Sequence, residues 1–129
     1  MFKTRRIYEK PEEEEGYRIL VDRLWPRGVS KERENIDLWM KDIAPSNELR
    51  KWYGHKVDNW PEFKTKYLEE LHEKKDLIKQ LKTLEKFHGK ITLLFSAKDE
   101  DHNNAVVLEE LLNQPVKTVK MSIARIHGS

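Results

Sequence analysis

Two polar stretches of the sequence carry side chains that can bind an anion or move a proton. Guanidinium and ammonium groups suit phosphate or carboxylate, while histidine and aspartate can transfer protons. The stretch "RILVDRLWPRG" (18–28) places such groups directly after an apolar run: Asp22, Arg23, Trp25 and Arg27. The stretch "KITLLFSAKDEDHNN" (90–104) does the same with Ser96, Lys98, Asp99, His102 and Asn103. These residues form the candidate ligand-binding set.

A structural role competes with the functional one at most of these positions. Asp99 is a favourable helix N-cap, and Trp25 is more typical of a packed core than of a stacking surface. Pro26 followed by Gly28 fits a type I turn. The aspartate and arginine that end the first apolar run can simply pair with their neighbours. Arg27 is the exception, because a turn does not require arginine and the planar guanidinium group of Arg27 suits phosphate.

A third stretch, "RKWYGHK" (50–56), mixes cations with aromatic rings, so it can stack a base and hold a phosphate. The competing interpretation, which we favour, packs the aromatic rings into the core and leaves the cations in solvent. Trp52 is kept as a ligand-binding candidate. A histidine titrates near neutral pH and can act as a general acid or base. The candidate catalytic groups are therefore His55 and His102, with Asp22 and Asp99 to orient them.

Familiar cofactor and metal motifs are missing from the sequence. It has no Walker-type glycine loop, no G-x-G-x-x-G fingerprint, no H-E-x-x-H and no nucleophile-elbow serine. The five histidines contain no i, i+4 pair. The carboxylates of "DEDH" (99–102) are explained more simply as acids in the first turn of a helix. We therefore expect no cofactor and no metal.

The predicted strands determine where these polar side chains lie in the fold. Apolar or alternating runs predict strands over residues 2–8, 17–24, 90–97 and 116–126. The intervening "EKPEEEEG" (9–16) is typical of a solvated loop. In open α/β sheets, ligands bind beyond the carboxyl ends of the strands. If the second and third of these strands are neighbours, the two polar clusters meet at one edge, beside a helix N-terminus that favours an anion.

Helices account for most of the remaining chain. Helical spacing predicts two short helices within 35–54, interrupted at Pro45, with Ser46 or Asn47 capping the second and Gly54 ending it. A long helical region follows from Trp60 to Gly89 with a break near Asp76, and a last helix covers 101–113. Strands separated by helices predict an α/β fold, with a small, mostly parallel sheet flanked by helices in a single compact domain.

Composition limits the class of protein. The 129 residues suit one domain, 1–129, with a flexible tail expected over 124–129. The net charge of +2, from 25 basic and 23 acidic residues, falls short of a nucleic-acid-binding signature. The absence of cysteine removes disulfides and thiolate chemistry. With no apolar leader and no run of membrane length, the sequence predicts a cytoplasmic protein without a membrane partner.

The combined motifs resemble a known family. "RILVDRLWPRGVSKE", "DLWMKDIAPSNELRKWYGH", "WPEFKTKYLEEL" and "LLFSAKDEDHNNAVVLEELL" are similar to the YeaO-like family of bacteria and archaea, an uncharacterised domain of unknown function numbered four-eight-eight. The resemblance covers about Ile7 to Leu112 and implies a cytoplasmic α/β domain without supplying a reaction. It implies a site cluster without catalytic roles: Asp22, Arg23, Trp25, Pro26, Arg27, Gly28, Trp52, Lys98, Asp99, His102 and Asn103.

A longer branch of the same family carries Cys-His-Arg after the Lys-Asp pair. This chain has Asn103, Asn104 and Ala105 in the corresponding place. The resemblance therefore implies that thiol or metal chemistry open to that branch is closed to this chain.

Three functions remain open from the sequence. The first, which we favour, is an uncharacterised protein that binds or acts on a small phosphate- or nucleotide-like anion at the carboxyl ends of its strands. The second is a nucleic-acid-associated binding module, based on "RKWYGHK" (50–56) and the slight basic excess. The third is a regulatory or interaction protein without catalysis. Whether the protein is an enzyme, and how many copies assemble, the sequence leaves open.

Overall fold

A four-stranded, fully parallel sheet forms the centre of the protein. The structure, a computed structural model, describes residues 1–114, so the strand predicted over 116–126 and the tail over 124–129 lie outside the described residues. The sheet order is β1-β4-β2-β3. Its strands are β1 (Phe2–Arg6), β2 (Tyr17–Leu20), β3 (Leu38–Trp39) and β4 (Ile91–Phe95). The predicted α/β class is confirmed, and β2 and β4 are direct neighbours.

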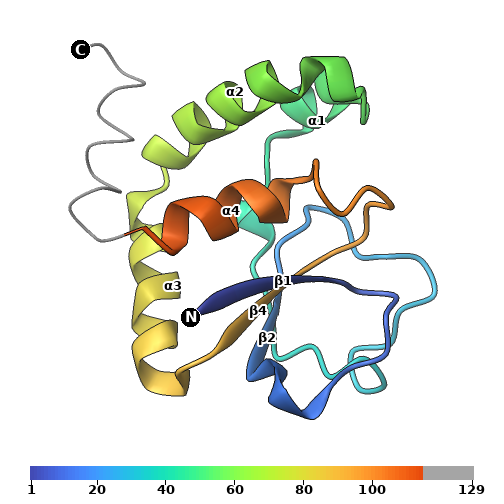
Figure 1. The fold of residues 1–129 in the computed structure, drawn as a ribbon, viewed down its shortest axis with the longest axis vertical. Helices are drawn as coiled ribbons and strands as arrows, with labels where there is room; N and C mark the ends of the chain where they lie inside the picture. The colour runs from blue at the N-terminus through green and yellow to red at the C-terminus, as the bar shows by residue number, and fades with distance from the viewer. Residues whose placement is uncertain (115–129) are drawn as a thin grey trace.

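The helices cover one face of this sheet. They are α1 (Asn47–Tyr53), α2 (Trp60–His72), α3 (Lys75–His88) and α4 (Asn104–Leu112). Helix α4 packs against β1 and β4, and α2 packs against α4 (Figure 1). Alternate residues of the central strands, such as Ile19 and Leu93, enter this main core together with Tyr67 and Leu108. The period-2 alternation sends their strand neighbours to the opposite face.

The opposite face is covered by the loop that joins β2 to β3. Leu20 and Leu94 pack there against Ile36, with Trp25 and Val29 partly buried around them. In Figure 1 this blue-to-cyan segment lies on the side of the sheet away from α3. Trp25 is thus a packing residue, and its indole Nε1 donates to the carbonyl of Val29 at 2.9 Å.

Capping signals explain where the helices begin and end. The Ser46 side chain accepts from the backbone N–H of Leu49, and Gly54, at φ 51°, ends α1 in the left-handed region, as predicted. Pro61 lies in the first turn of α2. The long helical region breaks at Glu73 and Lys74, just before the predicted position.

The helix predicted at the start of 35–54 is wrong. Residues 38–39 form β3, because the Met40 N–H donates to the Leu20 carbonyl and the chain pairs with β2. Only a short 3-10 helix, Lys41–Ile43, follows. Ile36 packs on the loop-covered face and Met40 on the helix-covered face. Their spacing matches a helix, but they are buried on opposite sides of a strand.

Two further local predictions are also corrected. Helix α4 begins at Asn104, and its N-cap is Asn103, whose side chain accepts from the Val106 N–H. Asp99 caps the preceding turn instead, accepting from the backbone N–H groups of Asp101 and His102. The turn after β2 spans 26–29, so Pro26 is its first residue, whereas the predicted type I turn has proline second and glycine fourth. Its third residue, Gly28, has φ 76°, which type I geometry does not have.

The predicted solvated loop 9–16 contains a buried acid. A 3-10 helix, Glu13–Glu15, ends there, and Glu15 is only 7% exposed. Its carboxylate forms an ion pair with Arg18, itself 3% exposed, and another with Arg5 at 3.2 Å. This glutamate is therefore part of the structure of the loop-covered face.

Side chains of α4 and of the residue after it engage the backbone of β1. The amide of Asn113 accepts from the Phe2 N–H at 3.1 Å and donates to the Phe2 carbonyl at 2.9 Å. The Glu109 carboxylate lies close to the backbone N–H of Thr4. These contacts fix the carboxyl end of α4 against the start of the sheet.

Candidate functional site

A hollow of about 360 Å³ lies at the carboxyl ends of β2 and β4. Its walls come from the segments after these two strands, from α1 and the residues around it, and from the starts of α2 and α4. The lining residues are Asp22, Arg23, Leu24, Pro45, Arg50, Lys51, Tyr53, His55, Phe63, Ser96, Ala97, Asn103 and Asn104. Its size lies within the range of small-molecule sites in proteins.

Asp22 joins the two strand ends inside this hollow. Its Oδ2 accepts from the Ser96 N–H at 2.9 Å and from Ser96 Oγ at 2.8 Å. Its Oδ1 accepts from Asn104 Nδ2 at 3.2 Å. Burial raises the pKa of Asp22, and the hydrogen bonds from Ser96 and Asn104, with the charge of Arg50, oppose that rise. The two polar clusters therefore meet at Asp22 and Ser96.

Four basic side chains line the same hollow. Arg23 donates from Nε to the Pro45 carbonyl at 2.9 Å and from Nη2 to the Ala44 carbonyl at 3.1 Å, so it mainly fixes the segment before α1. Arg50 donates from Nη1 to Asn47. Lys51 and His55 are exposed at the hollow. Cations therefore outnumber the one carboxylate in the lining.

The backbone places His55 in an unusual conformation. Gly54 and His55 both have positive φ, at 51° and 58°. A histidine in the left-handed region is uncommon, and such residues concentrate at functional sites. The bend after α1 brings His55 back over the hollow that Arg50 also lines.

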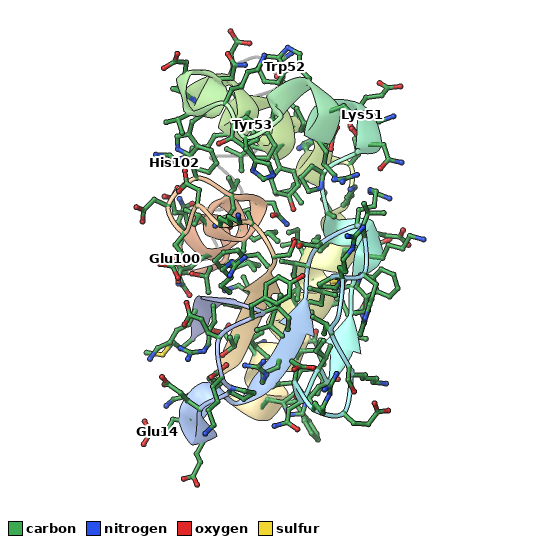
Figure 2. The ribbon with its side chains drawn as sticks, turned by 90° about the vertical axis from the view of Figure 1, so that its right-hand side faces the viewer. Glu14, Lys51, Trp52, Tyr53, Glu100 and His102 are labelled. Atoms are coloured by element: carbon green, nitrogen blue, oxygen red, sulfur yellow. The ribbon has the colours of Figure 1, made fainter. Side chains whose placement is uncertain are left out.

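Tyr53 lines the hollow and contacts the loop that carries His102. Its ring stacks on Phe63 at 4.3 Å, and its hydroxyl donates to the His102 carbonyl at 3.0 Å. Burial and the charge of Asp99 raise the pKa of Tyr53, which keeps this donor protonated. Figure 2 shows His102 on the opposite side of Tyr53 from Lys51.

Asp99 and His102 form a pair outside the hollow. His102 Nδ1 lies 2.9 Å from the Asp99 carboxylate, and its ring contacts Trp60 edge-on at 5.2 Å. The backbone N–H of Asp101 and the His102 side chain lower the pKa of Asp99. Neither residue lines the hollow, so the pair supports the turn before α4.

The structure brings together only part of the predicted set. Asp22, Arg23, His55, Ser96 and Asn103 line the hollow. The other predicted residues lie outside it: Trp25, Arg27, Trp52, Lys98, Asp99 and His102. Arg27 and Lys98 are exposed, and the backbone carbonyl of Arg27 accepts from the Tyr8 hydroxyl at 3.0 Å.

Trp52 points away from the cations that precede it in the sequence. Successive helical residues are about 100° apart around the axis, so Arg50 and Trp52 lie on nearly opposite flanks of α1. The Trp52 ring is 40% exposed and lies 5.1 Å from the Lys66 ammonium of α2. Figure 2 shows Trp52 on the outer side of α1. The "RKWYGHK" segment therefore does not form one continuous stacking surface.

The predicted set of site residues does not include three residues of the hollow that can form hydrogen bonds or ion pairs with a ligand: Arg50, Lys51 and Asn104. Arg50 and Lys51 belong to the "RKWYGHK" stretch, and the Ser46 cap indicates that they lie on a helix but not which face of it meets the hollow. Asn104 follows the N-cap, and its Nδ2 also donates to the Val21 carbonyl at 2.9 Å.

Another hollow in the described residues has a more acidic lining. A second hollow lies near the amino end of β2, and its lining holds Glu12, Glu13, Glu32 and Asp37 against Arg18 and Lys31. No group of three or more acidic or histidine side chains suited to a metal occurs within this described part. No helix described in residues 1–114 is long and apolar enough to cross a membrane.

Comparisons with known proteins identify the family. The uncharacterised protein YeaO of Escherichia coli is 44% identical over 108 residues, covering 84% of this chain and 93% of that protein. The uncharacterised protein Rv3073c of Mycobacterium tuberculosis and Mb3100c of Mycobacterium bovis are each 39% identical over 110 residues, covering 84% of this chain and 90% of theirs. No solved structure matches.

A family match extends the comparison over nearly the whole chain. Residues 1–127 match DUF488-N3i, described as the inactive DUF488-N3 subclade. The predicted YeaO-like relationship is thus confirmed. The chain belongs to DUF488-N3i, the inactive DUF488-N3 subclade.

Proposed function

We propose that this protein binds a small phosphate- or nucleotide-like anion in the hollow at the carboxyl ends of β2 and β4, and that it does not transform the ligand. The observation that carries the proposal is the convergence of Arg23, Arg50 and Lys51 on one hollow around a single carboxylate, Asp22. Ligands of parallel α/β sheets bind at this edge, and a guanidinium can bind a phosphate through two parallel hydrogen bonds.

Two observations support binding without catalysis. The family is described as an inactive subclade. In addition, the Asp99–His102 pair, which resembles an acid–base pair, lies behind Tyr53 and outside the hollow, so that of the candidate catalytic groups only Asp22 and His55 line it. A group that transfers protons must reach its substrate within hydrogen-bond distance. The lack of cysteine in the sequence fits a place in the cytoplasm, where thiols stay reduced.

The first test is calorimetric titration with inorganic phosphate, ribose 5-phosphate and adenosine monophosphate. We expect at least one of these anions to bind the unmodified protein. Arg50→Gln should weaken that binding about tenfold or more, because a hydrogen bond to a charged group contributes roughly 1.5–3 kcal/mol. Arg27→Gln, an exposed arginine outside the hollow, is the matched control and should change the dissociation constant less than twofold.

Two results would contradict the proposal. If none of the three anions binds at low ionic strength, the protein does not have the proposed function. If the two arginine variants lose affinity equally, the anion does not bind in the hollow. Phosphorus and proton NMR of the bound ligand after long incubation tests the second half of the proposal. Accumulation of a product would show that the protein is a catalyst.

A further inference from the structure

The charged groups of the hollow are unevenly placed. Asp22 is half-buried where β2 ends, whereas Lys51 and His55 are exposed on the side of α1. Arg50 acts on Asp22 through its charge. However, among residues 1–114 no basic side chain lies within ion-pair distance, 4.0 Å, of the Asp22 carboxylate. A ligand in this hollow therefore meets a carboxylate where β2 ends and exposed cations on the side of α1, with Arg23 also in the lining.

The Asp22 carboxylate keeps hydrogen-bonding capacity for a ligand. Its Oδ2 accepts two bonds from Ser96, at 2.9 and 2.8 Å. Its Oδ1 accepts one bond from Asn104, at 3.2 Å, and the same Nδ2 makes a shorter bond to the Val21 carbonyl. A carboxylate has about four acceptor positions. Oδ1 can therefore accept a further donor in the hollow that it lines.

The charges restrict what that donor can be. A second anionic group is repelled by Asp22 and attracted by Arg50, so the phosphate belongs at the α1 side. A ligand ammonium at Asp22 would meet the surrounding charges of Arg23, Arg50 and Lys51. An uncharged hydroxyl avoids both conflicts, and it donates to a carboxylate in a strong charge-assisted bond.

We propose that the ligand is a phosphorylated sugar, whose phosphate binds Arg50 and Lys51 and whose hydroxyl donates to Asp22 Oδ1. This inference rests on the proposed function and adds which uncharged group of the ligand contacts the protein. Burial raises the pKa of Asp22, and a ligand hydroxyl supplies the carboxylate with a further hydrogen bond at Oδ1. Free sugar phosphates and nucleotides share this chemistry.

The test compares two phosphate monoesters, of which only the first carries hydroxyl groups: ribose 5-phosphate and pentyl phosphate. Both carry one phosphate on a five-carbon frame. We expect the unmodified protein to bind ribose 5-phosphate about tenfold or more tightly, the effect of one hydrogen bond to a charged group. Adenosine monophosphate distinguishes the two sources, since tighter binding than ribose 5-phosphate indicates a nucleotide and weaker binding a free sugar phosphate.

Variants then assign the preference to Asp22. Asp22→Asn should reduce the preference to twofold or less while pentyl phosphate binds equally well or better, because the repelling charge is gone. Asn104→Ala, which keeps the carboxylate and frees Oδ1, should retain the preference. Circular dichroism confirms that each variant is folded.

The outcomes separate the inference from the proposed function. Equal binding of the two probes to the unmodified protein, or a preference that survives in folded Asp22→Asn, overturns the sugar assignment and leaves anion binding intact. If neither probe nor inorganic phosphate binds, the proposed function itself fails.

Discussion

At the scale of single residues, the most consequential side chains are acids placed where water reaches them poorly. Asp22 ties the end of β2 to the end of β4 through Ser96 and to α4 through Asn104. Glu15 performs a comparable task at the other end of β2, where it pairs with Arg18. Both acids position strands, but only Asp22 faces a hollow lined by cations.

Glu15 gives a direct test of the buried ion pair. Glu15→Ala leaves the Arg18 guanidinium buried with only the carbonyls of Glu34 and Asn35 as acceptors. Removing one partner of a buried pair costs about 3 kcal/mol or more, so we expect a loss of that size in the free energy of unfolding, measured in urea. Its exposed neighbour provides the control, since Glu14→Ala should change stability by less than about 0.5 kcal/mol. Similar losses in the two variants would argue against the pair.

At the scale of elements, the entry into β2 depends on a glycine. Gly16 has φ 69°, and a Cβ added there would lie 2.4 Å from the Lys90 carbonyl oxygen. The Tyr17 N–H donates to that same carbonyl at 3.0 Å. The chain can therefore begin β2 beside β4 only if residue 16 has no side chain.

Two alanine substitutions separate steric overlap from backbone strain. Gly28 also has positive φ, 76°, but a Cβ there meets nothing within 4 Å. Gly28→Ala should cost about 1–2 kcal/mol of unfolding free energy from the left-handed conformation alone. Gly16→Ala should cost about 1–3 kcal/mol more, because it adds an overlap with backbone and because φ 69° with ψ −138° lies outside the left-handed helical region. The urea concentrations at the midpoints of unfolding of the two variants measure this difference. Equal losses of stability would show that a small backbone shift relieves the overlap at residue 16.

Elements with strong local signals were predictable from the sequence, and the rest depended on distant partners. The runs that form β2 and β4 are apolar enough to indicate burial, and Ser46 and Gly54 mark the ends of α1. Residues 38–39 form a strand because they pair with β2, which local spacing cannot reveal. The cap at Asn103 was missed because Asp99 offers an equally good side chain four residues earlier.

The candidate site was predictable to the same extent. Adjacent parallel strands must end at one edge, so the meeting of Asp22 and Ser96 could be anticipated. The position of Arg50 depends on the rotation of α1 about its axis, and that of Arg27 depends on a turn that directs the chain away from the hollow. Neither rotation nor turn direction is readable from residue types alone.

At the scale of the whole molecule, buried acids on the helix-covered side shape the response to pH. Burial raises the pKa of Asp22 and of Glu109 above their unfolded values of 3.8 and 4.5. The folded state therefore holds these protons more tightly than the unfolded chain. Their contribution to stability is fully present below the unfolded values and is lost as the pH rises through the folded pKa.

Urea unfolding at a series of pH values between 4 and 7 tests the direction of this change in stability with pH. We expect Asp22→Asn to become progressively more stable relative to the unmodified protein as the pH rises, because the amide cannot ionise. Glu109→Gln should change in the same direction. A stability difference that stays constant over the whole series would contradict the assignment.

The contacts that α4 makes with β1 also limit how copies of this protein can associate. A neighbouring chain that extends a sheet must form hydrogen bonds with the main-chain groups of its outermost strand. At Phe2 both of those groups are already bonded to the Asn113 amide, and the Glu109 carboxylate lies close enough to the Thr4 N–H for that group to lower its pKa against the effect of burial. Strand addition, and the fibrous aggregation that it can initiate, would first have to displace these two side chains. The end of α4 and Asn113 thus protect the β1 edge of the sheet against strand addition by another copy.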